Sequence, residues 1–242
     1  MADQYTRTAL VLGDDAIAKL RKARVALFGL GGVGGYAAEV LARSGVGHID
    51  LIDDDTVSLT NLNRQLLALH STIGQHKVDV AAQRILDIDP TIEVRTYKTF
   101  YLPETASQFD FTQYDYVLDA IDTVTGKLAL IAQAKAAGTR IISCMGTGNK
   151  LDPSAFRVAD ISKTFGCALA RIIRKECGKR GLKDVKVVYS PELPVCPGAD
   201  PATLDEPQRE GSSRRSSPGS VAFVPAAAGI IMAGEAVKDL CK

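Results

Sequence analysis

The sequence predicts an α/β fold, in which a doubly wound and mostly parallel sheet is covered by helices on both faces. Three observations lead to this prediction. Short apolar runs alternate with helical segments up to about residue 144, as expected for parallel strands joined by crossover helices. A glycine-rich turn, GLGGVGG, follows the first apolar run, and an acidic segment, DDD, follows the second. Beyond residue 144 the alternation changes, so a mixed or antiparallel part is expected to complete the sheet.

Each element of the first half follows from a local pattern. Residues 1–23 are polar with scattered apolar positions, so we expect a helical lead-in that docks on the core. Gly45, Pro90 and Gly138 stop the three helices that come after it. The strands are predicted at residues 25–28, 48–52, 92–97, 116–120 and 140–144, and the helices at residues up to 44, 75–86 and 127–137. The apolar face of the helix at 75–86 is expected to consist of Val78, Ala82, Ile85 and Leu86.

The second half has fewer regular signals. Residues 155–160 and 185–189 read as strands around a helix at 164–179, and the first of these strands is expected off the parallel register. Residues 220–224 are predicted as a further strand, and Pro225 suits the first turn of a final helix.

Composition limits the classes of function and the domain organisation. The net charge is +1, so any attraction to nucleic acid has to be local. The five cysteines contain no C-x-x-C pair and no apolar signal segment opens the chain, which favours a cytoplasmic protein without stable membrane association. Residues 191–218 are rich in proline, serine, glycine and charge, which predicts a mobile surface loop. We expect a single domain over residues 1–242.

The glycine turn has the spacing of a phosphate-binding loop. Gly29, Gly31 and Gly34 match G-x-G-x-x-G, with Gly32 beside them, between a predicted strand and a predicted helix. Glycine lets the backbone approach an anion, and the N–H groups at the helix start point at it. Asp53 ends the next strand about 20 residues later, where a ribose hydroxyl is usually held. The pattern therefore predicts a Rossmann-like nucleotide site.

Further polar residues are expected at the same edge of the sheet. Arg64 and Gln65 follow closely enough to reach a phosphate, and Lys77 opens the next helix with a point charge. Asp122 follows the fourth strand, and one carboxylate together with phosphate oxygens is a common way to hold Mg²⁺. Taken singly, Arg64 and Lys77 also fit solvated helix charges, and Asp122 fits a helix cap.

The combined motifs resemble a known family. GLGGVGG, LIDDDTVSLTNLNRQ, Lys77 and DAIDT match the adenylating superfamily of ThiF, MoeB and the ubiquitin-activating enzymes. The resemblance implies that ATP is bound by the glycine loop and by Asp53, Asp55, Asn61, Arg64, Gln65 and Lys77, that Asp122 holds Mg²⁺, and that Arg7 is an arginine finger. In this family the finger acts on the partner subunit, which implies a homodimer. The implied chemistry is attack of a substrate carboxylate on the α-phosphate of ATP.

Within the superfamily, the segments NKLDP and ADISKT resemble the branch of tRNA threonylcarbamoyladenosine dehydratases. That branch implies a modified tRNA as the substrate and a net loss of water by cyclisation. Residues 157–186 carry nine basic residues against three acidic ones, a surplus that suits RNA phosphates but also suits a solvated helix face.

Other readings stay open at this point. A ThiF- or MoeB-type activator of a ubiquitin-like sulfur carrier is the main alternative, and a cysteine desulfurase or sulfur acceptor is a possible partner. A nicotinamide dehydrogenase would share the glycine loop and Asp53 but leaves Lys77 and DAIDT unexplained. A non-catalytic scaffold of the same fold would often lack the nucleotide contacts. Cys196 is the best placed of the cysteines if one of them is a nucleophile, although that role needs a positive neighbour or a helix start, and nothing nearby guarantees one.

Overall fold

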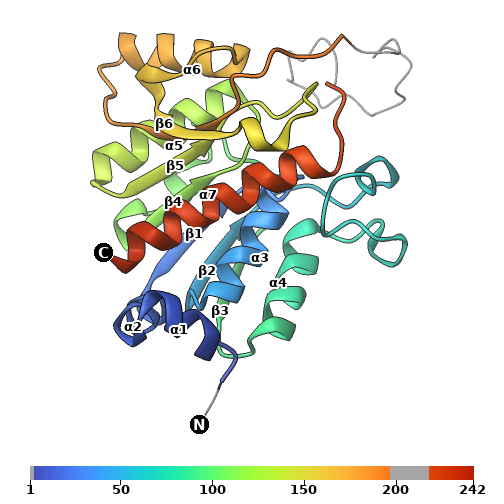
Figure 1. Ribbon diagram of the computed structural model, residues 1–242, viewed down its shortest axis with the longest axis vertical. Helices are drawn as coiled ribbons and strands as arrows, with labels where there is room; N and C mark the ends of the chain where they lie inside the picture. The colour runs from blue at the N-terminus through green and yellow to red at the C-terminus, as the bar shows by residue number, and fades with distance from the viewer. Residues whose placement is uncertain (1–2, 197–217) are drawn as a thin grey trace.

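The computed structural model contains one seven-stranded sheet with strand order β3-β2-β1-β4-β5-β7-β6. It describes residues 3–196 and 218–242 (Figure 1). All neighbouring pairs are parallel except β6 and β7, which are antiparallel. The predicted fold class, including the antiparallel end, is confirmed. The strands are β1 (Arg24–Phe28), β2 (His48–Ile52), β3 (Glu93–Tyr97), β4 (Tyr116–Asp119), β5 (Arg140–Cys144), β6 (Arg157–Asp160) and β7 (Lys186–Tyr189).

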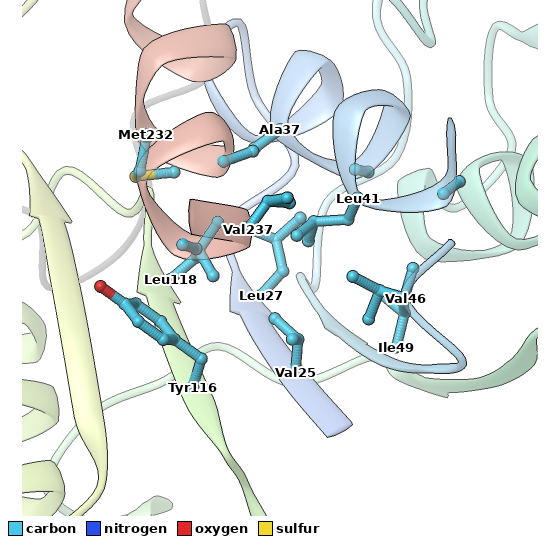
Figure 2. Packing of buried hydrophobic residues seen from close by; sticks show 14 of the residues in the cluster. Val25, Leu27, Ala37, Leu41, Val46, Ile49, Tyr116, Leu118, Met232 and Val237 are labelled. Atoms are coloured by element: carbon cyan, nitrogen blue, oxygen red, sulfur yellow. The ribbon is translucent and has the colours of Figure 1, made fainter. Parts of the chain in front are cut away.

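Helices cover both faces of the sheet because its central strands are apolar on both sides. Along β1, Val25 and Leu27 face one apolar cluster, and Ala26 and Phe28 face the other. Figure 2 shows the first cluster, in which side chains of β1 and β4 meet two helices. The first face is covered by α3 (Gly34–Ser44), α4 (Lys77–Ile88) and α7 (Phe223–Cys241), and the second by α5 (Val124–Ala137) and α6 (Ala168–Lys179). Short 3-10 turns lie at Leu59–Asn61, His70–Thr72, Ala106–Gln108, Phe111–Gln113, Pro153–Ala155 and Ile161–Lys163.

The expected helical lead-in is present as two short helices, α1 (Thr6–Leu12) and α2 (Asp14–Lys22). Buried Tyr5 anchors the first of them, since its hydroxyl donates to Asp89 Oδ2 at 2.6 Å and lies 3.1 Å from the carbonyl oxygen of Ala42. These two residues lie at the carboxyl ends of α4 and α3. The lead-in therefore sits at the amino edge of the sheet, at the lower end of Figure 1.

The predicted strand at residues 220–224 is wrong. The carbonyl of Ser220 accepts a hydrogen bond from Asn63 Nδ2 at 3.0 Å, and α7 already begins at Phe223. Pro225 lies in the first turn of α7, where its missing N–H is tolerated. The helix predicted at 164–179 begins only at Ala168.

Two smaller differences concern side-chain burial and the loop. In α4, Val78 and Ile85 are buried as expected. Between them Ala81 is buried and Ala82 only partly so, and Leu86 is exposed, because positions 78, 81 and 85 form one narrow stripe of the helix. Most of the loop predicted at 191–218 lies outside the described residues. Within residues 3–196 and 218–242, no helix combines the length and the apolarity needed to cross a membrane.

The carboxylate of Asp239 docks α7 on the sheet. Partial burial acts to raise its pKa, but hydrogen bonds from Lys186, Lys242 and Tyr116 outweigh burial and hold the pKa at about 2, against an ordinary 3.8. A lowered carboxyl pKa stabilises the folded state above the unfolded pKa, and this contribution is lost as pH falls from about 4 to 2.

We therefore expect Asp239→Asn to lower the free energy of unfolding by about 1–2 kcal/mol near pH 7. Urea denaturation of both proteins across the acid range is the measurement. The difference between variant and parent should shrink toward pH 2, whereas Asp87→Asn, an exposed carboxylate on α4, should leave stability unchanged. A pH-independent difference would contradict the assignment to this carboxylate.

Candidate nucleotide-binding site

The glycine loop between β1 and α3 is shaped by its own packing and leaves space at one position. Gly29 has φ +89°, and a Cβ there would lie 2.8 Å from the carbonyl oxygen of Ala120. A Cβ on Gly34 would lie 1.8 Å from the carbonyl oxygen of Gly29, so helix and strand meet too closely for any side chain. At Gly31, by contrast, the nearest atom is Gln65 Nε2 at 3.9 Å. The open position is the one that suits a phosphate.

Asp53 holds the loop in place from the end of β2. Its Oδ2 accepts from the backbone N–H of Leu30 at 2.6 Å, and its Oδ1 accepts from the N–H of Asp55 at 2.8 Å. The carboxylate thus joins the carboxyl ends of two adjacent strands. The ribose contact predicted for Asp53 remains a prediction, but its position beside the glycine loop agrees with it.

Lys77 is the buried cation of the site. It is the first residue of α4, its side chain is 5% exposed, and its Nζ lies 2.8 Å from Asp55 Oδ2. Burial lowers the pKa of Lys77 below its ordinary 10.5, and the charge of Asp53 acts against this shift. Arg64, Asp54 and Asp122 also act on Lys77 electrostatically. The structure therefore brings Asp53, Arg64, Lys77 and Asp122 together, although they come from four separate segments.

The segment after β2 contributes Asn61, Arg64 and Gln65. Asn61 is buried, and its Oδ1 accepts from the N–H of Ser58 at 3.2 Å, so it shapes the segment. Half-buried Arg64 donates to the carbonyl of Thr60 at 2.9 Å. Gln65 is 8% exposed, and its Oε1 has no hydrogen-bond partner among the described residues. An unsatisfied buried amide oxygen beside an open glycine is costly unless a ligand donates to it. The open position at Gly31 and the amide oxygen of Gln65 beside it therefore fit a nucleotide.

Asp122 lies in the exposed turn between β4 and α5. The N-cap of α5 is Thr123, so the reading of Asp122 as the helix cap is wrong. Near it, the carboxylates of Asp53, Asp54 and Asp55 each have an oxygen within 4.8 Å of the other two. Carboxylate oxygens are the donors that Mg²⁺ prefers. The donor set therefore fits a magnesium ion. The role of Asp122 as its ligand remains a prediction, and Asp54 is a carboxylate of this group that the sequence analysis did not single out.

A buried ionic network beneath this turn was missed in the sequence. Lys127 and Asp119 are both fully buried, with Lys127 Nζ 3.1 Å from Asp119 Oδ1 and 2.6 Å from the carbonyl of Cys144. Ser143 Oγ donates to Asp119 Oδ2 at 2.5 Å, and Asp119 Oδ1 also accepts from the N–H of Ile121. Burial raises the pKa of Asp119. The signal in the sequence was an aspartate ending an apolar strand and a lysine within an apolar helix.

Arg7 lies away from the cluster that Asp53, Arg64, Lys77 and Asp122 form in the same chain. It is exposed on α1, next to Tyr5, which contacts the far ends of α3 and α4. The 11 residues of α3 span about 16 Å at 1.5 Å each, which separates Arg7 from the glycine loop. The structure thus agrees with a role in trans but does not test it.

The cysteines differ in how far they are buried. Cys144, Cys167 and Cys177 are buried, and burial raises the pKa of Cys144 to about 12 and raises that of Cys177 as well. The thiols of Cys144 and Cys177 therefore stay protonated at neutral pH and are poor nucleophiles. Cys196 is exposed and remains the candidate if a cysteine takes part.

Comparison with known proteins identifies the family. The model of the ThiF family matches residues 4–242. The chain belongs to the ThiF family. It is 44% identical to the tRNA threonylcarbamoyladenosine dehydratase of Bacillus subtilis, over 100% of this chain and 96% of the relative, and 35% identical to the Escherichia coli dehydratase, over 98% and 93%. The crystal structure of E. coli tRNA N6-threonylcarbamoyladenosine dehydratase, TcdA, in complex with ATP matches with a TM-score of 0.86 at 33% identity, covering 98% and 93% of the two chains.

This ThiF-family match confirms the resemblance inferred from the motifs. It does not test the role of any single residue. The nucleotide contacts predicted for the glycine loop and for Asp53, Asp55, Asn61, Arg64, Gln65 and Lys77 therefore remain predictions that the geometry favours.

Proposed function

We propose that this protein catalyses the ATP-dependent dehydration of threonylcarbamoyladenosine beside the anticodon of tRNA. One observation carries the proposal: the chain matches two named dehydratases along nearly their whole length, and its fold places a buried cation and an open glycine loop at one edge of the sheet. The crystal structure of such a dehydratase with ATP supports ATP as the co-substrate.

The chemistry proceeds in two balanced steps. The threonyl carboxylate, already ionised at pH 7, attacks the α-phosphorus of ATP, and the bond to the β-phosphate breaks to give an acyl-adenylate and pyrophosphate. The carbamoyl oxygen or nitrogen then attacks the activated carbonyl carbon, AMP leaves with one carboxylate oxygen, and a proton is released. The modified base loses one water in total. The chain's contribution is to position and neutralise the phosphates through Lys77 and Arg64.

A magnesium ion held by Asp122 and phosphate oxygens would supply further charge neutralisation. Asp53 keeps the loop around the phosphates closed. Gln65 offers an acceptor for a donor group of the nucleotide. No side chain has to act as a general base in the first step, because the attacking carboxylate carries its charge in solution.

The proposal is tested by incubating the protein with ATP, Mg²⁺ and threonylcarbamoyl-modified tRNA, followed by mass analysis of the digested nucleosides. We expect an ATP-dependent loss of one water that is absent in Asp122→Ala and retained in Asp87→Ala, an exposed carboxylate at the other end of α4. If the mass is unchanged, and ATP–pyrophosphate exchange arises only when a carrier protein ending in Gly-Gly is added, the alternative activity on a sulfur carrier replaces this proposal. A desulfurase or sulfur acceptor would then be the expected partner.

We further propose that the enzyme works as a homodimer in the cytoplasm, with Arg7 of each subunit reaching the phosphates bound by the other. Exposed Arg7, far from the loop of its own chain, supports this arrangement. Arg7→Ala should lose turnover without losing stability. Mixing it with Lys77→Met, itself strongly impaired, should restore part of the activity, because a mixed dimer has one site with both cations intact. Failure of the mixture to recover, when both variants are shown to exchange subunits, would exclude a role in trans.

A further inference from the structure

An exposed aromatic ring lies in the turn that precedes α6. Phe165 is 54% exposed, although a phenylalanine ring gains much from burial. It contacts two side chains: buried Tyr189, with ring centroids 6.0 Å apart at 72°, and Arg157, whose guanidinium carbon lies 5.6 Å from the ring centroid. An aromatic ring beside an arginine is the pairing that single-stranded nucleic acids use for stacking.

The turn that carries the ring is held on both sides. Gly166 has φ +72°, and a Cβ there would lie 2.2 Å from the carbonyl oxygen of Pro191, so no other residue fits. On the preceding side, Thr164 Oγ1 donates to the carbonyl of Ile161 at 2.8 Å, and Arg174 donates to the carbonyl of Thr164. The backbone that carries the ring is therefore held in place, and little backbone entropy would be lost when a base stacks on the ring.

Phe165 lies at the same edge of the sheet as the nucleotide site, because its ring contacts Tyr189, the last residue of β7. A Cβ on Gly146 would lie 3.7 Å from Cys167 Sγ, so the turn before α6 packs on the segment that leaves β5. The strand order from the glycine loop outward is β1, β4, β5, β7. Three strand spacings amount to about 14 Å, a distance that nucleotides next to the reacting one can bridge. A polynucleotide whose modified base is at the site would pass the ring.

The charges around the ring favour a polyanion. Of the nine cations in residues 157–186, Lys186 pairs with Glu235 and Asp239, and Lys179 pairs with Glu176. The cations that are exposed and have no ion pair among the described residues are Arg157, Lys163, Arg171, Lys175, Arg180 and Lys183. Such a concentration in a protein of net charge +1 suits a phosphate backbone better than an apolar protein surface.

We propose that Phe165, together with Arg157, is the platform on which one unpaired base of the substrate RNA stacks beside the base that is modified. The inference deepens the proposed function and rests on it. A phenylalanine ring makes no hydrogen bonds to the edge of a base. It therefore selects an unpaired, unstacked nucleotide rather than a particular base. The exposed cations supply the backbone contacts, and the ring fixes the register of the strand.

The test compares variants that differ only in the ring. Phe165→Leu keeps an apolar side chain but removes the π face, and Phe165→Trp restores a larger one. We expect Phe165→Leu to weaken binding of the modified anticodon stem-loop by about 5- to 100-fold, and Phe165→Trp to bind at least as well as the parent. The loss should persist at high salt, whereas the loss in Arg157→Gln should depend on salt because it includes a charge.

Further readouts separate this role from a structural one. KM for the stem-loop should rise in Phe165→Leu while KM for ATP stays unchanged, and the melting temperature should stay within a few degrees of the parent. Leu86→Ala, also exposed but on α4 at the other side of the sheet, is the matched control. Equal affinity of Phe165→Leu and the parent would overturn the platform. The proposed function would fail separately, by the absence of water loss with the unaltered protein.

Discussion

Lys77→Met is expected to lower kcat/KM by about 10²- to 10³-fold, the range found when one preorganised donor to a developing charge is removed. Methionine keeps the length and the apolar stem of lysine but removes the ammonium group. The carboxylate of Asp55 loses its partner at 2.8 Å, but Asp55 is 36% exposed and can be hydrated. The loss should therefore appear in activity and hardly in stability.

Two measurements check this expectation. Steady-state turnover is compared with that of Lys98→Met, an exposed lysine paired with Asp79, which should behave as the parent. The lowered pKa of Lys77 has a second consequence, because only the protonated form can neutralise phosphate. Activity should decline on the alkaline side below pH 10.5, the ordinary pKa of lysine. A Lys77→Met enzyme within twofold of the parent would show that the ammonium group does not act on the phosphates.

Lys127→Met is expected to lower the free energy of unfolding by about 3–5 kcal/mol, the cost of leaving one partner of a buried ion pair without the other. Asp119 would then keep its charge only in an environment that already raises its pKa. A group with a raised folded-state pKa disfavours folding as pH rises above its unfolded pKa. The loss should therefore be smaller at pH 5 than at pH 8, because protonation removes the buried charge.

Chemical denaturation at the two pH values measures this effect. The double variant Lys127→Met/Asp119→Leu, which removes both charges, should recover much of the stability. Lys135→Met is the control and should change stability little, because half-buried Lys135 lies near the end of the same helix and donates to the carbonyl of Asp184. A double variant as unstable as the single one would mean that the pair acts through packing rather than through charge.

The difference between these two lysines shows what the sequence could and could not predict. Lys77 opens a helix after a loop, where its position at the carboxyl edge follows from the βαβ order, and the structure places it there. Lys127 sits on the face of α5 that packs on β5 and α6, so its partners Asp119 and Ser143 follow only from tertiary packing. The strands at 48–52 and 140–144 were predicted to the residue because glycines end the helices before them, at Gly45 to Gly47 and at Gly138.

The misread segment at 220–224 has a related cause. Ser-Val-Ala-Phe-Val between a glycine and a proline has the composition of a strand. In the structure the carbonyl of Ser220 accepts a hydrogen bond from Asn63, and α7 begins at Phe223. The small residues of α7 let it approach α3 closely, since a Cβ on Gly229 would lie 2.2 Å from the carbonyl oxygen of Val33. This helix-to-helix contact outweighs the local preference.

The outer strand β3 has a consequence for how the protein behaves at high concentration. An edge strand exposes unpaired backbone groups that can template intermolecular pairing. Here the exposed Glu93 and Arg95 form an ion pair at 2.6 Å, and His48 on β2 lies 3.3 Å from Glu93. Two copies meeting edge to edge would have to strip water from these charges. The same strand that completes the sheet thus protects the protein against aggregation through that edge.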